Sequence, residues 1–368
     1  MANIPKLLKE WRALQPLDEK LERDINQQFM IDFNYNSNHL EGNTLTYEQT
    51  KLLLLFGDTI GNASIQDYEE MKAHNVGLEL MKAAAKDKNR MLSEHFIREL
   101  NQTILVRDFY KMSRDSNYRY KIHVGVYKTR PNSVVTSTGE IFDYASPEET
   151  PSLVSDLAKW YCNEEQRGKL KPEELAAMFH YRYIRIHPFE DGNGRIARLL
   201  VNYILLRHNY PMIVIRSDDR QNYLKTLHQC DLLSGKIPYD RAHADLQQTK
   251  PLIDYISGIL ENKLPVLIQL AKGEISEFIE AKDNEKSGQK NGQKTAEKID
   301  TENGTENDTV NQKIIDLIQQ MPKITIDKIA VQTGKSRRTI IRRMQKLKTD
   351  GFIKRIGGDK GGYWKVKK

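Results

Sequence analysis

The sequence has few of the features that mark secreted or membrane-spanning proteins. It contains only two cysteines, Cys162 and Cys230, so we expect no disulfide framework. The longest aliphatic run, LLLLF at 52–56, is far shorter than the roughly 20 apolar residues that a membrane-spanning helix needs. The first residues, MANIPKLLKEW, contain no apolar signal core. Together these absences predict a cytoplasmic protein without a membrane partner.

Charge is distributed unevenly along the 368 residues. Residues 311–368 contain 16 lysines and arginines against 4 acidic residues, a net charge of +12. Because the whole chain carries +7, the first 310 residues must sum to −5. A basic module attached to a mildly acidic body suggests a nucleic-acid partner for the module and a different partner for the body.

A segment of different composition separates the body from the basic module. Residues 281–310 have no aromatic side chain and almost no aliphatic one, and they are rich in Asn, Gly, Lys, Glu and Thr. Such a segment cannot bury enough apolar surface to offset the entropy lost on ordering. We therefore predict a flexible linker over 281–310.

The body is predicted to be mainly α-helical. Apolar residues recur at helical spacing over 172–186, and a second stripe over 196–204 follows the i, i+3, i+4, i+7 pattern. Residues 121–144 break this period, because they are rich in Val, Ile, Thr and Tyr and are punctuated by Gly and Pro. That composition predicts a short β-hairpin on a helical body.

Between the two helical stripes the sequence reads HPFEDGNGRIAR, residues 187–198. Glycines at 192 and 194, with Asn193 between them, let the backbone approach a ligand closely. The helix that follows adds unpaired N–H groups and partial positive charge, which favour a phosphate. Arg195 and Arg198 are three residues apart and share a helix face, so both can grip phosphate oxygens. The stretch predicts an anion cradle.

Two more side chains of this stretch give the cradle a chemistry. Asp191 lies at its rim and is suited to Mg²⁺, which prefers one or two carboxylates together with phosphate oxygens. His187 can accept a proton near neutral pH. A base, a metal-holding acid and an anion cradle together predict nucleotidyl or phosphoryl transfer to a hydroxyl.

The stretch resembles the Fic-domain motif HPFx[D/E]GNGRxxR at every defining position, and the resemblance extends over roughly 35–260. It implies a Fic fold that transfers AMP from ATP to a Tyr, Ser or Thr hydroxyl of a target protein. His187 would deprotonate the hydroxyl, and Asp191 would bind Mg²⁺ between the α- and β-phosphates. The resemblance assigns the anion hole to Gly192, Asn193 and Gly194, and the β- and γ-phosphates to Arg195 and Arg198.

Two other segments resemble the same family. Tyr223 falls where the family places an aromatic side chain near the adenine, although its helical spacing suits core packing equally well. The hairpin 121–144 corresponds to the family's flap, an extended strand that aligns a target segment by main-chain hydrogen bonds. This flap has Tyr127-Lys128 where the family has a Tyr-Arg pair. The flap residues expected to touch the nucleotide are Val135 and Thr136.

Residues 34–46, NYNSNHLEGNTLT, are predicted to end a helix, because Gly42 and Asn43 favour a helix C-terminus. Glu41 would then project from the last turn. A carboxylate is unfavourable at that end of the helix dipole, so we expect a cationic partner for it.

The same stretch resembles the Fic inhibitory motif [S/T]xxxE[G/N], matched by Ser37, Glu41 and Gly42. The resemblance implies an inhibitory helix around 34–43, placed before the Fic core. Glu41 would pair with Arg198, deny that arginine to the γ-phosphate and push ATP into an unproductive pose. In some relatives the same glutamate supports AMP removal by aligning a water, and this alternative stays open.

Residues 311–368 have the pattern of a winged helix-turn-helix. Ile340, Ile341, Met344 and Leu347 would face the core from the third helix, and a glycine-rich turn near the end would join the two strands of the wing. The third helix would enter a major groove. Its DNA-binding residues are expected to be Arg337, Arg338, Arg342 and Arg343. The alternative is a solvated basic face used for protein contacts or dimerisation.

We therefore expect an N-terminal helical region (1–110), a Fic core (111–270), the linker (281–310) and a winged helix-turn-helix (311–368). The first hypothesis is a protein adenylyltransferase that uses ATP and Mg²⁺ and is inhibited by Glu41. The second is a DNA-bound regulator whose Fic domain senses nucleotide and transfers little. A third keeps the fold but transfers UMP or phosphate. A homodimer also stays open.

Overall fold

The computed structural model describes residues 4–59, 61, 63–112, 118–132, 134–135, 141–235 and 237–275, and, further along, 313–319, 321–322, 324–333, 340, 343–344, 347–348, 353–356 and 363–366. The predicted linker 281–310 and the site candidates Thr136, Arg337, Arg338 and Arg342 lie outside these residues. The chain divides into two compact units, Met1–Ala281 and Lys282–Lys368.

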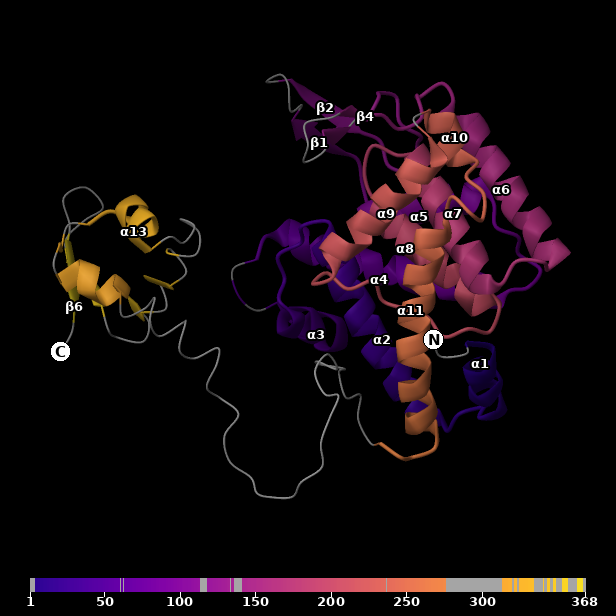
Figure 1. Cartoon of the computed structure of the whole chain (residues 1–368), viewed down its shortest axis with the longest axis horizontal. Helices are drawn as coiled ribbons and strands as arrows, with labels where there is room; N and C mark the ends of the chain where they lie inside the picture. The colour runs from indigo at the N-terminus through magenta and orange to yellow at the C-terminus, as the bar shows by residue number, and fades with distance from the viewer. Residues whose placement is uncertain are drawn as a thin grey trace. The chain divides into compact units, whose positions relative to one another are not determined.

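The first unit is built almost entirely of helices (Figure 1). They are α1 (Ile4–Ala13), α2 (Glu19–Leu40), α3 (Tyr47–Phe56), α4 (Ile65–Lys86), α5 (Glu94–Leu105), α6 (Thr150–Arg167), α7 (Pro172–Ile186), α8 (Asn193–Arg207), α9 (Arg220–Ser234), α10 (Pro238–Ala242) and α11 (Lys250–Ala271). None of the helices in the described part of the chain is long and apolar enough to cross a membrane.

Helices α7 and α8 form the centre of this unit and pack against each other, with α4 and α11 packed on them in turn. Both were expected to bury one apolar stripe, yet nearly every residue of each is buried. The reason is that neighbouring helices cover them on several sides, so their polar residues are enclosed as well. One hydrophobic core extends from Ile4 to Leu264, so the regions 1–110 and 111–270 share it.

The strands of the first unit form two small antiparallel pairs. β1 (Phe109–Met112) pairs with β2 (Arg119–Ile122), and β3 (Val134–Val135) pairs with β4 (Ile141–Phe142). Among its described residues, the hairpin predicted over 121–144 therefore contains only the β3–β4 pair. The end of β2 also falls within 121–144, but β2 pairs with the preceding strand β1. The sequence FYKM of β1 contains two aromatic residues that favour strands, but it is only four residues long and shows no alternation of burial, so the pattern did not mark it as a strand.

The second unit has the elements expected of a winged helix-turn-helix. Residues 313–319 are helical, α13 spans Ile326–Thr333, and β5 (Ile353–Ile356) pairs antiparallel with β6 (Tyr363–Val366). Its small core includes Ile340, Met344 and Leu347, three of the four residues predicted to face inward, while Ile341 is not described. The expected fold class, mainly helical with small β-hairpins, is confirmed.

Candidate active site

The site begins where α7 ends. His187 caps α7 by donating its N–H to the Tyr183 carbonyl at 3.0 Å, and its φ of 51° places it in the left-handed region. A non-glycine residue rarely adopts this conformation, and the following Pro188 has no N–H with which to continue the helix. The chain therefore turns sharply at this histidine and enters the loop that leads to α8.

The imidazole of His187 is held on two sides. Its Nδ1 lies 3.3 Å from the Ile184 carbonyl, and its ring stacks on Tyr144 at 4.1 Å between centroids. Since a carbonyl only accepts, this contact favours the tautomer with the proton on Nδ1, which leaves Nε2 as a hydrogen-bond acceptor. Burial and the charge of Lys128 lower the pKa of His187 to about 3, so the ring is neutral at physiological pH.

Asn193 and Gly192 fix the shape of the loop. The side-chain amide of Asn193 accepts a hydrogen bond from the Phe189 N–H at 3.0 Å and donates one to the Phe189 carbonyl at 2.6 Å. Gly192 has a φ of 81°, and a Cβ there would lie 3.1 Å from the side chain of Ile104. A larger residue would be strained in backbone and crowded in space, so glycine is needed at this position.

The base of the flap holds the loop from outside, through contacts that the sequence did not predict. Lys128 donates its backbone N–H to the Pro188 carbonyl at 2.8 Å and its ammonium to the Ile186 carbonyl at 3.0 Å. Asn132 donates to the Phe189 carbonyl at 3.0 Å. Burial lowers the pKa of Lys128 to about 7. The departure from the family's Tyr-Arg pair was the only sequence signal that pointed to Lys128.

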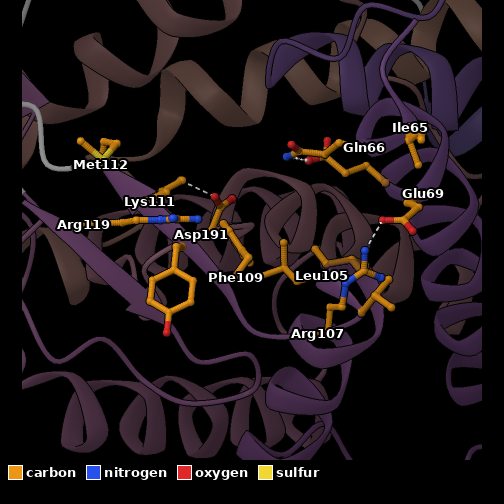
Figure 2. Close-up of a pocket in the computed structure, with 14 residues that line it drawn as sticks. Ile65, Gln66, Glu69, Leu105, Arg107, Phe109, Lys111, Met112, Arg119 and Asp191 are labelled. Carbon is orange, nitrogen blue, oxygen red and sulfur yellow. Dashed lines mark hydrogen bonds and ion pairs between the residues drawn. The ribbon is translucent and has the colours of Figure 1, made fainter.

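Asp191 lies at the edge of a cavity of about 630 Å³ between the start of α4, the end of α5 and β1 (Figure 2). Lys111 of β1 forms an ion pair with Asp191 Oδ2, and Arg195 Nη2 lies 3.3 Å from Oδ1. Burial opposes ionisation of this carboxyl, but Lys111 and Arg195 lower its pKa overall, so it is a carboxylate. Among the described residues, Asp191 is not part of any group of three or more Asp, Glu, His or Cys side chains that could hold a metal ion together.

That single carboxylate fits Mg²⁺ better than a metal that needs a full set of protein ligands. Mg²⁺ keeps several waters and is commonly held by one or two carboxylates together with substrate phosphates. Arg195 favours a phosphate beside the metal. Its guanidinium is 4% exposed, its Nε and Nη1 make no hydrogen bond to any described residue, and Glu70 is 3.6 Å from Nη1. Buried N–H groups without acceptors are costly, so an anionic ligand suits this position.

Arg198, in contrast, donates three hydrogen bonds to residues at the end of α2. It donates from Nε to Ser37 Oγ at 2.9 Å, and from Nη2 to the Ser37 carbonyl at 2.8 Å and to Glu41 Oε1 at 2.7 Å. α2 ends at Leu40, within the stretch 34–46 where a helix end was predicted, and Glu41 is its C-cap residue and not part of its last turn. Burial raises the pKa of Glu41, but the charge and hydrogen bond of Arg198 outweigh it, so the pKa is lowered and Glu41 is ionised.

The carboxylate of Glu41 lies in the expected anion cradle. A Cβ added to Gly194, in the first turn of α8, would collide with Glu41 Oε1 and would lie 3.1 Å from Arg198 Nη1. Gly194 therefore permits an oxyanion to lie directly against the helix N-terminus, where the unpaired N–H groups and the helix dipole favour negative charge. The fold brings Ser37, Glu41, Gly194 and Arg198 together.

The remaining candidates lie elsewhere or are described only in part. Tyr223 of α9 is 4% exposed, and its hydroxyl lies 2.7 Å from His180 Nε2, so it packs within the core. Its contact with adenine stays a prediction. Val135 belongs to β3, whose backbone alone is described. Arg343 is partly buried in the second unit.

Comparison with known proteins identifies the families of both units. The Fic/DOC family profile matches residues 91–205, and a winged helix-turn-helix DNA-binding profile matches residues 307–354. Similar curated proteins include protein adenylyltransferase Fic of Culex quinquefasciatus, 28% identical over 71% of this chain and 49% of that protein. Protein adenylyltransferase fic-1 of Caenorhabditis elegans is 28% identical over 77% of this chain and 53% of that protein. The chain spans about half the length of these relatives.

Solved structures are also similar. A Fic domain-containing signaling protein from Bacteroides thetaiotaomicron is 58% identical, with a TM-score of 0.71 over 75% of this chain and 99% of that one. Residues 134–508 of Fic-1 from Caenorhabditis elegans share the fold, with a TM-score of 0.57 and 24% identity over 74% of this chain and 72% of that one. The chain therefore belongs to the Fic/DOC family, with a winged helix-turn-helix module attached to its Fic domain.

Proposed function

We propose that this chain is a protein adenylyltransferase, which transfers AMP from ATP to a hydroxyl of a target protein. The observation that carries the proposal is a neutral imidazole, at His187, followed five to seven residues further along the same loop and helix by an anion cradle. The names of the relatives, protein adenylyltransferases, support the same class of reaction.

Each residue of the site has its own role in the proposed reaction. His187 Nε2 accepts the proton of the target hydroxyl, and the hydroxyl oxygen attacks the α-phosphorus of ATP. The bond from the α-phosphorus to the bridging oxygen breaks, and pyrophosphate leaves. Arg195 and the N–H groups at the start of α8 neutralise the charge that builds on the phosphates. When Mg²⁺ is bound, held by Asp191, it shields the phosphate charge further and orients the triphosphate.

We also propose that the contact between Glu41 and Arg198 inhibits transfer. It withdraws Arg198 from the γ-phosphate, and it places a carboxylate beside Gly194, where a phosphate oxygen would otherwise lie. Two anions cannot share that position, because like charges repel strongly in a partly enclosed site. ATP bound beside Glu41 would have to shift its terminal phosphate, and its α-phosphorus would leave the line of attack.

Two labels on ATP test the proposed reaction. The Glu41→Gly protein is incubated with ATP labelled at either the α- or the γ-phosphate, and the label carried by protein is measured. We expect transfer of the α-label only, and none after a second change, His187→Ala, which should leave ATP binding largely intact. Label transferred from the γ-position alone would identify a kinase. Transfer that persists without His187 would remove it as the base.

The second unit is proposed to bind DNA. Residues 307–354 match a DNA-binding winged helix-turn-helix profile, and the net charge of +12 over 311–368 favours a polyanionic partner.

A further inference from the structure

A second histidine lies behind the inhibitory contact and takes no part in the proposed reaction. His74 of α4 is fully buried, and its Nε2 lies 3.1 Å from Ser37 Oγ. On the other side of the ring, Nδ1 lies 2.6 Å from Asn34 Oδ1. Ser37 is the residue whose hydroxyl and carbonyl oxygens both accept hydrogen bonds from Arg198.

The direction of each hydrogen bond follows from the arginine. Because a guanidinium only donates, Ser37 Oγ must accept from Arg198 Nε. The hydroxyl proton of Ser37 is then free to point to His74 Nε2, which accepts it. His74 carries its own proton on Nδ1 and donates it to Asn34 Oδ1.

The chain of hydrogen bonds ends on backbone and amide acceptors. The amide nitrogen of Asn34 donates to the Met30 carbonyl at 2.9 Å and to Asn75 Oδ1 at 2.9 Å. Each link of this chain, from Arg198 Nε through Ser37 and His74 to Asn34, thus joins one donor to one acceptor, provided that His74 is neutral. Burial and the charges of Arg195 and Arg198 lower the pKa of His74 well below its ordinary value, which keeps the ring neutral.

We propose that His74 is a positioning residue of the inhibitory contact: it orients the Ser37 hydroxyl and ties the last turns of α2 to α4, so that Arg198 is held against Glu41. A serine on an isolated helix is free to turn its hydroxyl to several acceptors, including the carbonyl one turn back. His74 selects the one arrangement that presents an oxygen lone pair to Arg198. This inference rests on the proposed inhibition by Glu41.

The test is His74→Leu, which keeps a buried side chain of similar bulk but removes the acceptor. A hydrogen bond that supports a charged group contributes enough to shift the equilibrium between held and released Arg198 by roughly tenfold. We expect His74→Leu to raise α-label transfer by about that factor, and to tighten the binding of ATP measured by calorimetry, since a released arginine can meet the γ-phosphate. His74→Gln, which keeps an acceptor near the position of Nε2, should restore most of the inhibition.

Two controls separate positioning from loose packing. Met81→Ala removes a buried side chain of α4 that belongs to the hydrophobic core and not to the hydrogen-bond chain, and it should not activate. In the Glu41→Gly background, His74→Leu should change neither transfer nor ATP affinity, because no inhibitory contact is left to release. Equal effects of His74→Leu with and without Glu41 would overturn the inference.

Failure of the proposed reaction and failure of the role of His74 would give different results. Should Glu41→Gly transfer no α-label, the proposed reaction is wrong, and the ATP affinity of His74→Leu still decides the role of His74. Should His74→Leu not fold, Ser37→Ala replaces it, because it removes the hydroxyl that His74 orients and leaves the Ser37 carbonyl in place. No gain in ATP affinity with Ser37→Ala would reject the role.

Discussion

Glu41 and Arg198 are 157 residues apart in the sequence and 2.7 Å apart in the fold. Arg198 is 3% exposed, whereas the Glu41 side chain is 40% exposed, so the pair lies at the border between core and solvent. Solvent can therefore reach the contact from the Glu41 side, while Arg198 stays enclosed among the helices.

The charge of Glu41, and not only its size, should set the strength of inhibition. Glu41→Gln keeps the length of the side chain and one acceptor, but it loses the ion pair. Charge-assisted hydrogen bonds contribute about 1.5–3 kcal/mol, against about 1 kcal/mol for neutral ones. We therefore expect transfer of α-labelled AMP to rise in the order wild type, Glu41→Gln, Glu41→Gly, with roughly tenfold or more between the extremes. Identical rates for the three proteins would argue that this contact has no inhibitory role.

Lys128 should matter to the loop although it is outside the central motif. Lys128→Met keeps the length of the side chain but leaves the Ile186 carbonyl without its ammonium donor. A buried carbonyl without a partner costs about 1–3 kcal/mol, so urea unfolding should show a loss of that size. Transfer in the Glu41→Gly background should also fall, because Ile186 would lose this contact and His187 is the next residue along the chain. Lys128→Arg is the matched control, since it keeps a charged donor, and full activity with Lys128→Met would contradict the assignment.

Lys111 should compete with the metal. Its ammonium pairs with the carboxylate that we assign to Mg²⁺, so the pair must separate before the cation binds. Lys111 is half exposed, and pairs of that kind contribute only about 0.2–1 kcal/mol. Lys111→Ala in the Glu41→Gly background should therefore lower the Mg²⁺ concentration needed for half-maximal transfer by about two- to fivefold. Arg107→Ala, which breaks the nearby pair with Glu69, serves as control and should leave the Mg²⁺ dependence unchanged.

Mild acid should destabilise the first unit. The pKa of His74 is lowered well below 6.5, and those of His180 and His187 are lowered to about 3, so the unfolded chain binds more protons than the folded one. Stability from these groups is present above pH 6.5 and is lost as the pH falls from 6.5 toward 3. Each imidazole can remove up to about 1.4 kcal/mol per pH unit.

Urea titrations between pH 7 and pH 5 measure this effect, because an unfolded imidazole gains its proton in that range. His180→Gln should reduce the slope of unfolding free energy against pH, while replacement of the exposed His95 should leave it unchanged. A free energy of unfolding that does not change between pH 7 and pH 5 would show that these rings are not buried and neutral.

The second unit should carry the affinity for DNA. A chain that ends at residue 281 should lose DNA binding that weakens with added salt, and it should keep the transfer activity of the Glu41→Gly protein. Binding that releases counterions falls linearly in log affinity with log salt, so fluorescence anisotropy at several salt concentrations gives the number of phosphates contacted. Unchanged affinity after truncation would place the basic surface in the first unit.

The central loop could be predicted from the sequence because its parts are local. His187, the glycines and the arginines lie within twelve residues, so their spacing fixes their relation to one helix. The supports of that loop come from distant segments. Lys128 of the flap donates to the Ile186 and Pro188 carbonyls, and Asn101 of α5 donates its side-chain N–H to the Asp191 carbonyl at 2.9 Å. The support of the inhibitory contact, His74, comes from α4. A single buried lysine, asparagine or histidine has no period, so no pattern in the sequence distinguishes it from an ordinary core residue.

Other features of the fold were also hard to predict from the sequence, for similar reasons. The β1–β2 pair was missed because a four-residue exposed strand carries little hydrophobic alternation. The burial of α7 and α8 on several sides exceeded the predicted stripes because it depends on how many helices pack around them. The identity of Arg198 as the partner of Glu41 was predicted only from the family resemblance, because no pattern in either segment points to the other.

The space above Gly194 is occupied by Glu41, so the proposed inhibitor and the site belong to the same chain. Because Glu41 is tethered, its effective concentration at the cradle does not change with the amount of protein. Dilution would leave the inhibited fraction as it is, whereas a rise in free nucleotide would compete Glu41 away from the same few ångströms of backbone. The activity per molecule of such an enzyme would then follow the supply of ATP and would not depend on the enzyme's own concentration.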